Sequence, residues 1–561
     1  MANVFLCIPP DYDYNFPPLA TPALCAYLKD NRIRVFQEDL NLRYRNFLVQ
    51  RIRGAGLKEN EKEILLRDIL KEFFSRKLFD RYYSSFMPRL DDGVSLYLPY
   101  DNNSNSSFYF TERLLSSEHF FRYLEDKKEN TFLRFYQSRG IIGYLRKQKV
   151  DLVGISIISP SQVIPGLTLG LLVKKNFPQA HVNIGGQWPT LYRKQLLKRK
   201  DLFACFDSVI VFEGETPLLK LAKALREKSS LRIPNVILAD SGEDYSSGHT
   251  EENMDFLPCP DFTGLPLKQY RNSRDGGINL TYETSRGCYW SKCAYCVDLP
   301  LPKPSYRHKS VELVARDMKL LRKKYKAVNL MFGDPGLAPR QMLEISRMIV
   351  KKNIKIDWWT MARLDPGFNR GIFDIAFKAG LKQINFGFES ASDRICSLLD
   401  KGNLRQRSER IIRDCSCAGI SVDLQTMIGL PHESLADGLE TVDFLVSNRE
   451  FIGHVTFNVY YLTPANYVYL NPRKYGIEYQ KKELPFRFFI PFENTKGMNK
   501  FDAALLEKIY LSLVFRGRKK AEEKPKIKAR NIKGNLEFSL NGESITLKYS
   551  YNRATGAISL G

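Results

Sequence analysis

The sequence lacks an apolar run of the roughly 20 residues that a membrane-spanning helix needs. It also lacks a basic leader and a cleavage site at its start, where residues 2–8 have the pattern of a buried strand instead. We therefore expect a cytoplasmic protein without a membrane partner. Because 43% of the residues are hydrophobic and 12% are aromatic, wholesale disorder is excluded.

Acidic residues are few, since 62 Asp and Glu stand against 85 Lys and Arg, which gives a net charge of +23. Such a surplus favours anionic partners such as nucleic acid, acidic peptides or phosphorylated cofactors. The alternative is a solvated, solubilising surface, because the charges are spread along the chain. The densest basic run, residues 516–533, has no interleaved aromatic residue, so it is a poor platform for single-stranded nucleic acid.

The ten cysteines are scattered except for Cys288, Cys293 and Cys296, which are spaced C-x-x-x-x-C-x-x-C. A disulfide framework is not favoured, because the remaining cysteines are scattered and no secretion signal is seen. Thiolates are soft ligands that suit iron–sulfur clusters and zinc. A structural zinc site needs four protein ligands, so Cys259 or a histidine would have to complete it. A [4Fe–4S] cluster held by three cysteines would keep one iron open for chemistry.

Strand-like and helix-like stretches alternate over residues 1–250, apart from residues 46–147, which we interpret as a helical insertion. Strands are expected at 2–8, 33–38, 152–158, 181–184 and 207–212, and helices at 21–30, 161–176, 189–199 and 215–227. This alternation predicts an α/β domain with a doubly wound, Rossmann-like parallel sheet, whose ligands lie beyond the carboxyl ends of the strands. The candidate ligand-binding residues at these ends are Ser159, Ser161, Gln162, Gly185, Gly186, Gln187, Glu213, Gly214 and Glu215.

A linker at 251–277 precedes six strand–helix repeats at 278–475, with strands at 278–284, 328–332, 354–360, 383–388, 422–428 and 454–461. This pattern predicts a partial (β/α)6, TIM-like barrel with its active site at the carboxyl ends of the strands. Residues 476–561 are expected to form a small α+β cap. Its helix is placed at 501–515, and Asn541-Gly542 predicts a hairpin between two strands.

The strand at 278–284, the turn Ser285-Arg286-Gly287 and the cysteine loop together resemble the radical S-adenosylmethionine (SAM) enzymes. The first gap between cysteines is one residue longer than the usual C-x-x-x-C-x-x-C spacing of that family. The resemblance implies a [4Fe–4S] cluster bound by Cys288, Cys293 and Cys296, together with SAM.

The N-terminal half resembles the cobalamin-binding domain that precedes many radical SAM cores, and this resemblance implies a cobalamin cofactor. The matching stretches are Pro17-Pro18-Leu19 with Tyr27-Leu28, Val153-Gly-Ile-Ser156, Pro178 with Gly185-Gly186, and Glu213-Gly-Glu215-Thr216. None of the six histidines follows an aspartate by two residues, so the D-x-H-x-x-G motif that supplies a lower cobalt ligand is absent. A degenerate domain without cofactor is the alternative.

The resemblance also implies SAM contacts at Asp334, Arg363 and Glu389, within Phe-Gly-Asp, Ala-Arg-Leu-Asp and Gly-Phe-Glu-Ser. These side chains suit the ammonium, carboxylate and ribose of SAM. The alternative for Arg363 is a local salt bridge with Asp365.

We assign catalysis to the three cysteines and Tyr460. Besides Asp334, Arg363 and Glu389, we expect Tyr295 and Ser390 to bind a cofactor in the barrel. Tyr295 lies between the last two cysteines and would shield the cluster or touch the adenine of SAM. Tyr289 and Trp290 could pack against the corrin ring or cap the cysteine loop, and the sequence does not separate these roles.

The implied activity is that of a cobalamin-dependent radical SAM methyltransferase acting on an unactivated carbon of a peptide or natural product. One SAM would methylate reduced cobalamin, and another would be cleaved by an electron from the cluster to a 5′-deoxyadenosyl radical that abstracts hydrogen from the substrate. The run Ser-Arg-Gly-Cys-Tyr-Trp resembles cluster loops of enzymes that mature ribosomal peptides, and an acidic precursor peptide would suit the charge of +23.

Two alternatives remain open, a cyclase or rearrangement enzyme with the same cofactors and an RNA-modifying radical SAM enzyme. Expected partners are a small-molecule or peptide substrate and an electron donor such as flavodoxin or ferredoxin. We expect a monomer.

Overall fold

The computed structural model describes two compact units, of which Met1–Tyr282 makes up most of the first and Glu283–Lys319 with Val328–Lys482 most of the second. The described residues are 2–10, 16–54, 119–128, 130–241, 250–270, 277–296, 305–464, 466–479, 490–499, 502–503, 506, 528–532, 535–540, 543–552 and 557–560.

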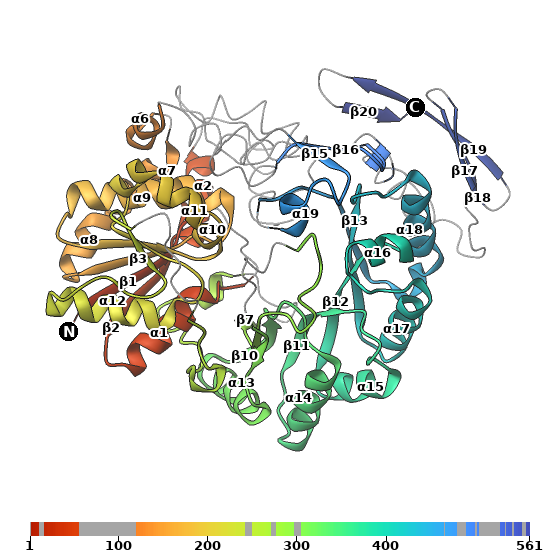
Figure 1. Ribbon diagram of the computed structural model, residues 1–561. Coiled ribbons are helices and arrows are strands. Elements are labelled where there is room, and N and C mark those ends of the chain that lie inside the picture. Colours follow the sequence, from red (N-terminus) through yellow and green to blue (C-terminus); the bar gives the residue numbers. More distant parts are fainter. Residues whose placement is uncertain are drawn as a thin grey trace. The chain divides into compact units, whose positions relative to one another are not determined.

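The first unit is built on a six-stranded sheet with the order β2-β1-β3-β4-β5-β6 (Figure 1). Its strands are β1 (Asn3–Ile8), β2 (Arg34–Asp39), β3 (Leu152–Ser156), β4 (His181–Gly185), β5 (Ser208–Ile210) and β6 (Val236–Leu238). The pairs from β2 to β5 are parallel, which confirms the predicted doubly wound sheet. The prediction was wrong at one edge, because β6 was not foreseen and runs antiparallel to β5.

Helices cover both faces of this sheet. Alternate residues of a strand point to opposite faces, and here both faces carry apolar side chains. In β1, Phe5 and Cys7 belong to one apolar cluster, whereas Val4 and Leu6 belong to another. Helix α9 is buried along most of its length, as its apolar composition requires. The helices of this unit are α1 (Ala20–Asp30), α2 (Leu40–Gly54), α6 (Phe120–Glu125), α7 (Thr131–Ser138), α8 (Ile141–Lys147), α9 (Val163–Asn176), α10 (Gln187–Leu191), α11 (Arg193–Lys198) and α12 (Glu215–Glu227).

The second large sheet has the order β14-β13-β12-β11-β10-β7, with its strands in sequence order across the sheet. They are β7 (Ile278–Tyr282), β10 (Ala327–Phe332), β11 (Asp357–Arg363), β12 (Leu381–Glu389), β13 (Ser421–Ile428) and β14 (His454–Val459). Neighbouring strands from β10 to β14 are parallel, so the predicted partial barrel is confirmed.

Helices line the outer face of this sheet, with α14, α15, α17 and α18 in successive positions (Figure 1). In α14, Met342, Ile345 and Ile349 are buried at the spacing of one helical face, which packs this helix on the sheet. The helices are α13 (Val311–Tyr325), α14 (Pro339–Lys351), α15 (Arg370–Lys378), α16 (Asp393–Leu398), α17 (Arg405–Cys417), α18 (Leu435–Ser447) and α19 (Tyr467–Leu470).

The C-terminal strands β17 (Lys528–Ile532), β18 (Asn535–Leu540), β19 (Glu543–Asn552) and β20 (Ala557–Leu560) form an antiparallel sheet. Leu540 pairs with Glu543, which confirms the predicted hairpin, while Asn541-Gly542 and most of the helix predicted at 501–515 lie outside the described residues. Short antiparallel pairs join β8 (Ser285–Arg286) to β9 (Arg307–His308) and β15 (Ile477–Tyr479) to β16 (Phe492–Asn494).

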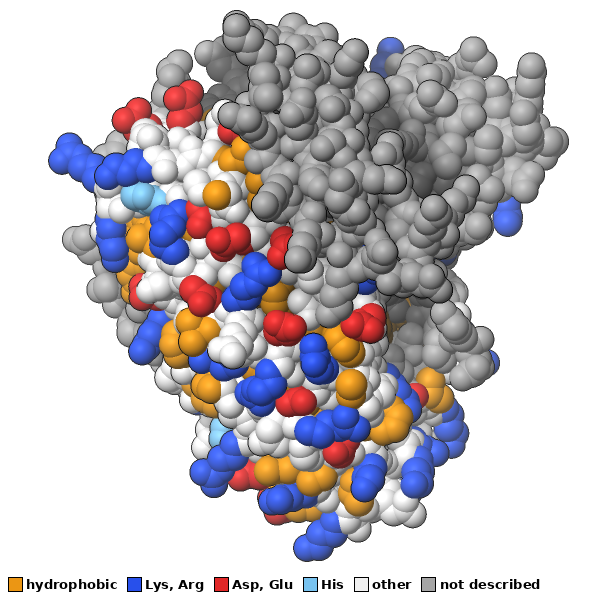
Figure 2. Space-filling model, turned by 90° about the vertical axis from the view of Figure 1, so that its right-hand side faces the viewer, with side chains coloured by type: hydrophobic (Ala, Val, Ile, Leu, Met, Phe, Trp, Pro, Cys, Tyr) orange, Lys and Arg blue, Asp and Glu red, His pale blue; other side chains and the backbone are white. Residues whose placement is uncertain are grey.

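Charged side chains of both signs are intermixed on the face drawn in Figure 2. Lys and Arg lie beside Asp, Glu and apolar side chains there, instead of forming one continuous basic stripe. Within the part of the chain that the structure describes, no helix has the length and apolar character needed to cross a membrane.

Candidate functional site

The three candidate cluster ligands lie on one loop that follows β7 and β8. Cys288, Cys293 and Cys296 are half-buried and carry free thiols. Gly287 precedes the first of them with a φ of 73°, a left-handed conformation that favours glycine. The loop therefore begins with a sharp turn from the strand into Cys288.

Two distant segments hold the backbone of the cysteine loop. The N–H of Ala294 donates to the carbonyl of Leu399 at 3.0 Å, and its carbonyl accepts from the N–H of Val468 at 3.3 Å. The side-chain amide of Asn466 donates to the carbonyl of Tyr295 at 3.2 Å. These contacts fix the loop between the turn after α16 and the start of α19.

Arg363 reaches the cysteines from the carboxyl end of β11. Its Nη1 donates to the Sγ of Cys293 at 3.6 Å, and its Nη2 donates to the carbonyl of Lys401. The guanidinium lies 4.2 Å from the ring centroid of Trp290. Among the described residues no ion pair joins Arg363 to Asp365, so the alternative of a local salt bridge is wrong.

Trp290 caps the cysteine loop within the second unit. Its Nε1 donates to the carbonyl of Asp400 at 2.6 Å, and its ring fills the space above Gly402. Tyr289 packs edge-on against Tyr306, with ring centroids 5.9 Å apart. These contacts are those of a side chain that caps the loop, and packing of Trp290 or Tyr289 against a corrin ring stays a prediction.

Glu389, at the end of β12, forms a buried ion pair that the sequence did not reveal. Its Oε1 lies 3.0 Å from the Nζ of Lys401. Burial by itself would lower the pKa of Lys401, but the neighbouring Glu389 carboxylate offsets this and the pKa is raised. A Cβ at Gly387 would lie 2.7 Å from this Nζ, so the glycine makes room for the pair. Glu389 itself has a φ of 65°, a strained value for a non-glycine residue.

Asp334, at the end of β10, anchors the start of the cysteine loop. Its Oδ1 accepts hydrogen bonds from the N–H and hydroxyl groups of both Thr284 and Ser285. Burial raises the pKa of Asp334 to about 6 despite these donors. Its Oδ2 is buried and has no partner among the described residues, so one oxygen remains for a ligand.

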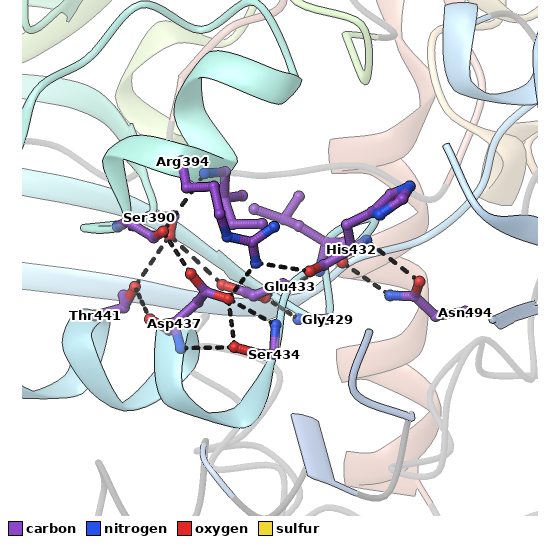
Figure 3. A network of polar contacts seen from close by, with 12 residues as sticks. Ser390, Arg394, Gly429, His432, Glu433, Ser434, Asp437, Thr441 and Asn494 are labelled. Carbon is purple, nitrogen blue, oxygen red and sulfur yellow. Dashed lines mark hydrogen bonds and ion pairs between the residues drawn. The ribbon is translucent and has the colours of Figure 1, made fainter. Parts of the chain in front are cut away.

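Ser390 directs its hydroxyl into the interior between β12, β13 and α18 (Figure 3). The hydroxyl lies 3.2 Å from that of Thr441 and 3.5 Å from the Oε1 of Glu433, and it accepts from the N–H of Ser392. This network engages the hydroxyl of Ser390, and the cofactor contact expected for this residue stays a prediction. The Ser390 side chain therefore positions the end of β12 in this structure.

Glu433 is the second buried group that sequence reasoning missed. Its Oε2 accepts from the N–H groups of Gly429 at 2.6 Å and Leu430 at 3.0 Å. Burial raises the pKa of Glu433 to about 8. The available signal was a glutamate directly after the Gly-Leu-Pro-His turn at the end of β13.

Tyr295 and Tyr460 contribute to one apolar cluster beside the cysteine loop. Both hydroxyls are buried without a hydrogen-bond partner among the described residues, and burial raises the pKa of each. Tyr460 also packs edge-on against Phe492, with centroids 5.6 Å apart. An unpaired buried hydroxyl is costly, so both groups suit a site that receives a ligand. Their assigned roles stay predictions.

In the first unit, the loop after β3 is held by its own side chains. Gln162 is fully buried, and its Oε1 accepts from the N–H groups of Ile158 and Ser159 at 2.9 and 3.2 Å. Its Nε2 donates to the carbonyl of Pro9 at 2.8 Å. The hydroxyls of Ser159 and Ser161 lie 2.5 Å apart. Gln162 therefore shapes the loop, while the two serines remain half-exposed.

The other residues predicted in this unit lie at the carboxyl ends of β4 and β5. Gly186 has a φ of 105°, and a Cβ there would lie 2.5 Å from the carbonyl oxygen of Ile157. Glu213 accepts from the N–H of Glu252 at 2.9 Å. Gly185 ends β4, Gln187 opens α10, Gly214 precedes α12, and Glu215 is its buried first residue. Together with Ser159 and Ser161 they occupy the edge where doubly wound sheets bind ligands.

The donor set on the cysteine loop fits an iron–sulfur cluster. No three His, Cys, Asp or Glu side chains in the described part of the chain converge on a point where a single metal ion could sit. In a [4Fe–4S] cluster each thiolate binds its own iron, so the three cysteines need not converge. Three half-buried thiols beside an Arg363 N–H donor and the unpaired Tyr295 hydroxyl suit such a cluster.

Comparisons with known proteins agree with this geometry. Residues 282–445 match the Radical SAM superfamily. An uncharacterised methyltransferase of Pyrococcus horikoshii is 27% identical over 305 residues, which cover 54% of this chain and 65% of that protein. The chain therefore spans less than two thirds of the length of this curated relative.

Two solved structures share the fold at low sequence identity. The cobalamin-dependent SAM radical enzyme OxsB, with aqua-cobalamin bound, superposes with a TM-score of 0.60 at 16% identity, over 92% of this chain and 67% of that one. The radical SAM methyltransferase TsrM from Kitasatospora setae, with its tryptophan substrate and a SAM analogue, gives a TM-score of 0.59 at 14% identity. The superposition covers 91% of this chain and 89% of that one.

Proposed function

Residues 282–445 match the Radical SAM superfamily, and from that premise we propose that the chain is a cobalamin-dependent methyltransferase acting on an unactivated carbon of a peptide or natural product. The observation that carries the proposal is the placement of Cys288, Cys293 and Cys296 on one half-buried loop at the carboxyl end of a partial barrel. An α/β unit built on a mostly parallel sheet precedes that barrel in the chain.

The three cysteines would hold the cluster, and residues at the ends of β10 and β12 would bind SAM. The unpaired Oδ2 of Asp334 is the acceptor for a ribose hydroxyl or an ammonium group. Glu389, neutralised by Lys401, offers a second carboxylate. When bound, the cluster would supply the electron that cleaves SAM, and cobalamin would carry the methyl group.

The apolar cluster beside the cysteine loop would exclude water from the reacting groups. Leu399, Leu430 and Val468 are buried there with Tyr460. Dry surroundings protect reactive intermediates from side reactions and strengthen electrostatic interactions. The hydroxyl of Tyr460 is the polar group of this wall that we assign to the reaction.

The substrate class is inferred from charge. A net charge of +23 suits an acidic precursor peptide, whose binding would weaken with salt. Activity on a free small molecule with no dependence on a peptide would contradict this part of the proposal. Binding of RNA with a steep salt dependence, lost on deletion of residues 516–561, would favour the RNA-modifying alternative instead.

Anaerobic reconstitution with iron, sulfide and hydroxocobalamin tests both cofactors. We expect about four irons and about one cobalt per chain, and Cys288→Ala should remove the iron. Cobalt-free protein with a full iron content would overturn the cobalamin half of the proposal. The mass of the product decides the reaction, because a gain of one methyl group indicates methyl transfer and its absence a cyclase or rearrangement enzyme.

A further inference from the structure

We propose that Arg363 is a positioning residue of the cluster, which donates a hydrogen bond to the Cys293 thiolate and thereby raises the reduction potential. The inference rests on the proposed function, since it requires a cluster on the cysteine loop. It gives Arg363 a role that differs from the SAM contact expected from the sequence.

The charge of Arg363 has no partner of opposite sign in the described structure. Its side chain is 7% exposed, and no carboxylate of the described residues forms an ion pair with it. Its Nε is also buried without an acceptor. A buried cation is costly unless an anion lies nearby. The candidate anion in contact with it is the Sγ of Cys293, 3.6 Å from Nη1, which becomes a thiolate when a cluster binds.

Two groups hold the guanidinium in this place. The face of Trp290 lies against it at 4.2 Å, and the carbonyl of Lys401 accepts from its Nη2. Trp290 is fixed in turn by the 2.6 Å hydrogen bond from its Nε1 to the carbonyl of Asp400. Arginine suits such a position because its planar fork stacks on an aromatic ring and donates in fixed directions.

The neighbouring glycine shows how closely this arrangement is packed. Gly402 has a φ of 73°, and a Cβ there would lie 2.7 Å from the ring of Trp290. The turn 400–402 thus brings a carbonyl to each of Trp290 and Arg363 and leaves no side chain between them.

Reduction adds one negative charge to the cluster and its thiolates. A hydrogen bond and a positive charge at one ligating sulfur stabilise the reduced form more than the oxidised form, which raises the reduction potential. Lys401 contributes less to this effect, because Glu389 neutralises its charge at 3.0 Å. Arg363 is therefore the cation that we expect to act on the cluster.

The test compares Arg363→Met, which removes charge and donors, with Arg363→Lys, which keeps the charge. Arg340→Met is the matched control, since Arg340 is an exposed residue of α14 that pairs with Glu344. Each protein is reconstituted with iron and sulfide without SAM, its iron is counted, and the reduced cluster is titrated by electron paramagnetic resonance. We expect a more negative midpoint for R363M, a smaller shift for R363K and none for R340M.

The outcomes separate this inference from the proposed function. A wild-type midpoint in an iron-replete R363M would overturn the role of Arg363 and leave the cluster assignment intact. Absence of a cluster from the unmodified protein would overturn the proposed function itself. If R363M does not retain iron, the midpoint potential of R363K decides. A midpoint more negative than that of the unmodified protein supports the inference, and an equal midpoint contradicts it.

Discussion

Glu433 combines complete burial with two hydrogen bonds from backbone N–H groups (Figure 3). Burial raises its pKa to about 8, whereas an unfolded chain would give a value near 4. Between these pH values the folded chain binds a proton at Glu433 that the unfolded chain does not bind. The stabilisation that protonated Glu433 contributes to the folded state is therefore fully present below about pH 4 and decreases as the pH rises toward about 8.

Replacing Glu433 by glutamine should remove this pH dependence. The amide oxygen can still accept from Gly429 and Leu430, and the side chain never ionises. We expect the thermal midpoint of E433Q to fall less between about pH 5 and 8 than that of the unmodified protein, by the equivalent of a few kcal/mol. Calorimetry over a pH series measures the thermal midpoints of both proteins. Glu409→Gln, on the exposed face of α17, is the control, and parallel pH profiles for E433Q and the unmodified protein would contradict the prediction.

The residues that sequence reasoning missed share one physical property, which is that distant neighbours decide their state. The state of Lys401 depends on Glu389, which β12 places beside it. The direction of the Ser390 hydroxyl depends on Thr441, 51 residues away in the sequence. Cys288, Cys293 and Cys296 were predictable, because ligands on one loop leave their signature in local spacing.

At the scale of elements, most strands of the barrel were predictable from apolar runs, because a strand covered on one or both faces has a periodic or continuous apolar pattern. Strand β13 begins within one residue of its predicted position, whereas β11 begins at Asp357, later than the predicted 354. The edge strand Val236–Leu238 is three residues long, too short for any periodicity to show.

The turn 400–402 offers a test of how one connecting element supports the cysteine loop. Gly402→Ala would place a Cβ 2.7 Å from the Trp290 ring at a φ of 73°. We expect a loss of about 1–3 kcal/mol in stability and a lower iron content after reconstitution, because the displaced ring no longer caps the loop. Gly143→Ala is the control, since nothing lies within 4 Å of its added Cβ. Full iron content in G402A, at the level of G143A, would show that the turn is not needed.

At the scale of the whole molecule, the chain consists of two units that each have an apolar core of their own. Units with separate cores can respond separately to mutation. The candidate cobalamin residues all lie in the first unit and the candidate cluster ligands all lie in the second. The two cofactors should therefore be separable by single substitutions.

Gly186→Val and Cys288→Ala are the substitutions that test this separation. A side chain at Gly186 would lie 2.5 Å from the carbonyl oxygen of Ile157 at a φ of 105°, so it must displace the loop at the carboxyl edge of the first sheet. After reconstitution with both cofactors, we expect G186V to lose most of its cobalt and keep its iron, and C288A to show the reverse. Metal analysis of the monodisperse fraction measures both contents, with G143A as the control for a glycine substitution in the same unit. Loss of both metals in either variant would show that the two units bind their cofactors as one cooperative whole, and full cobalt in G186V would remove this edge of the sheet from the cobalamin site.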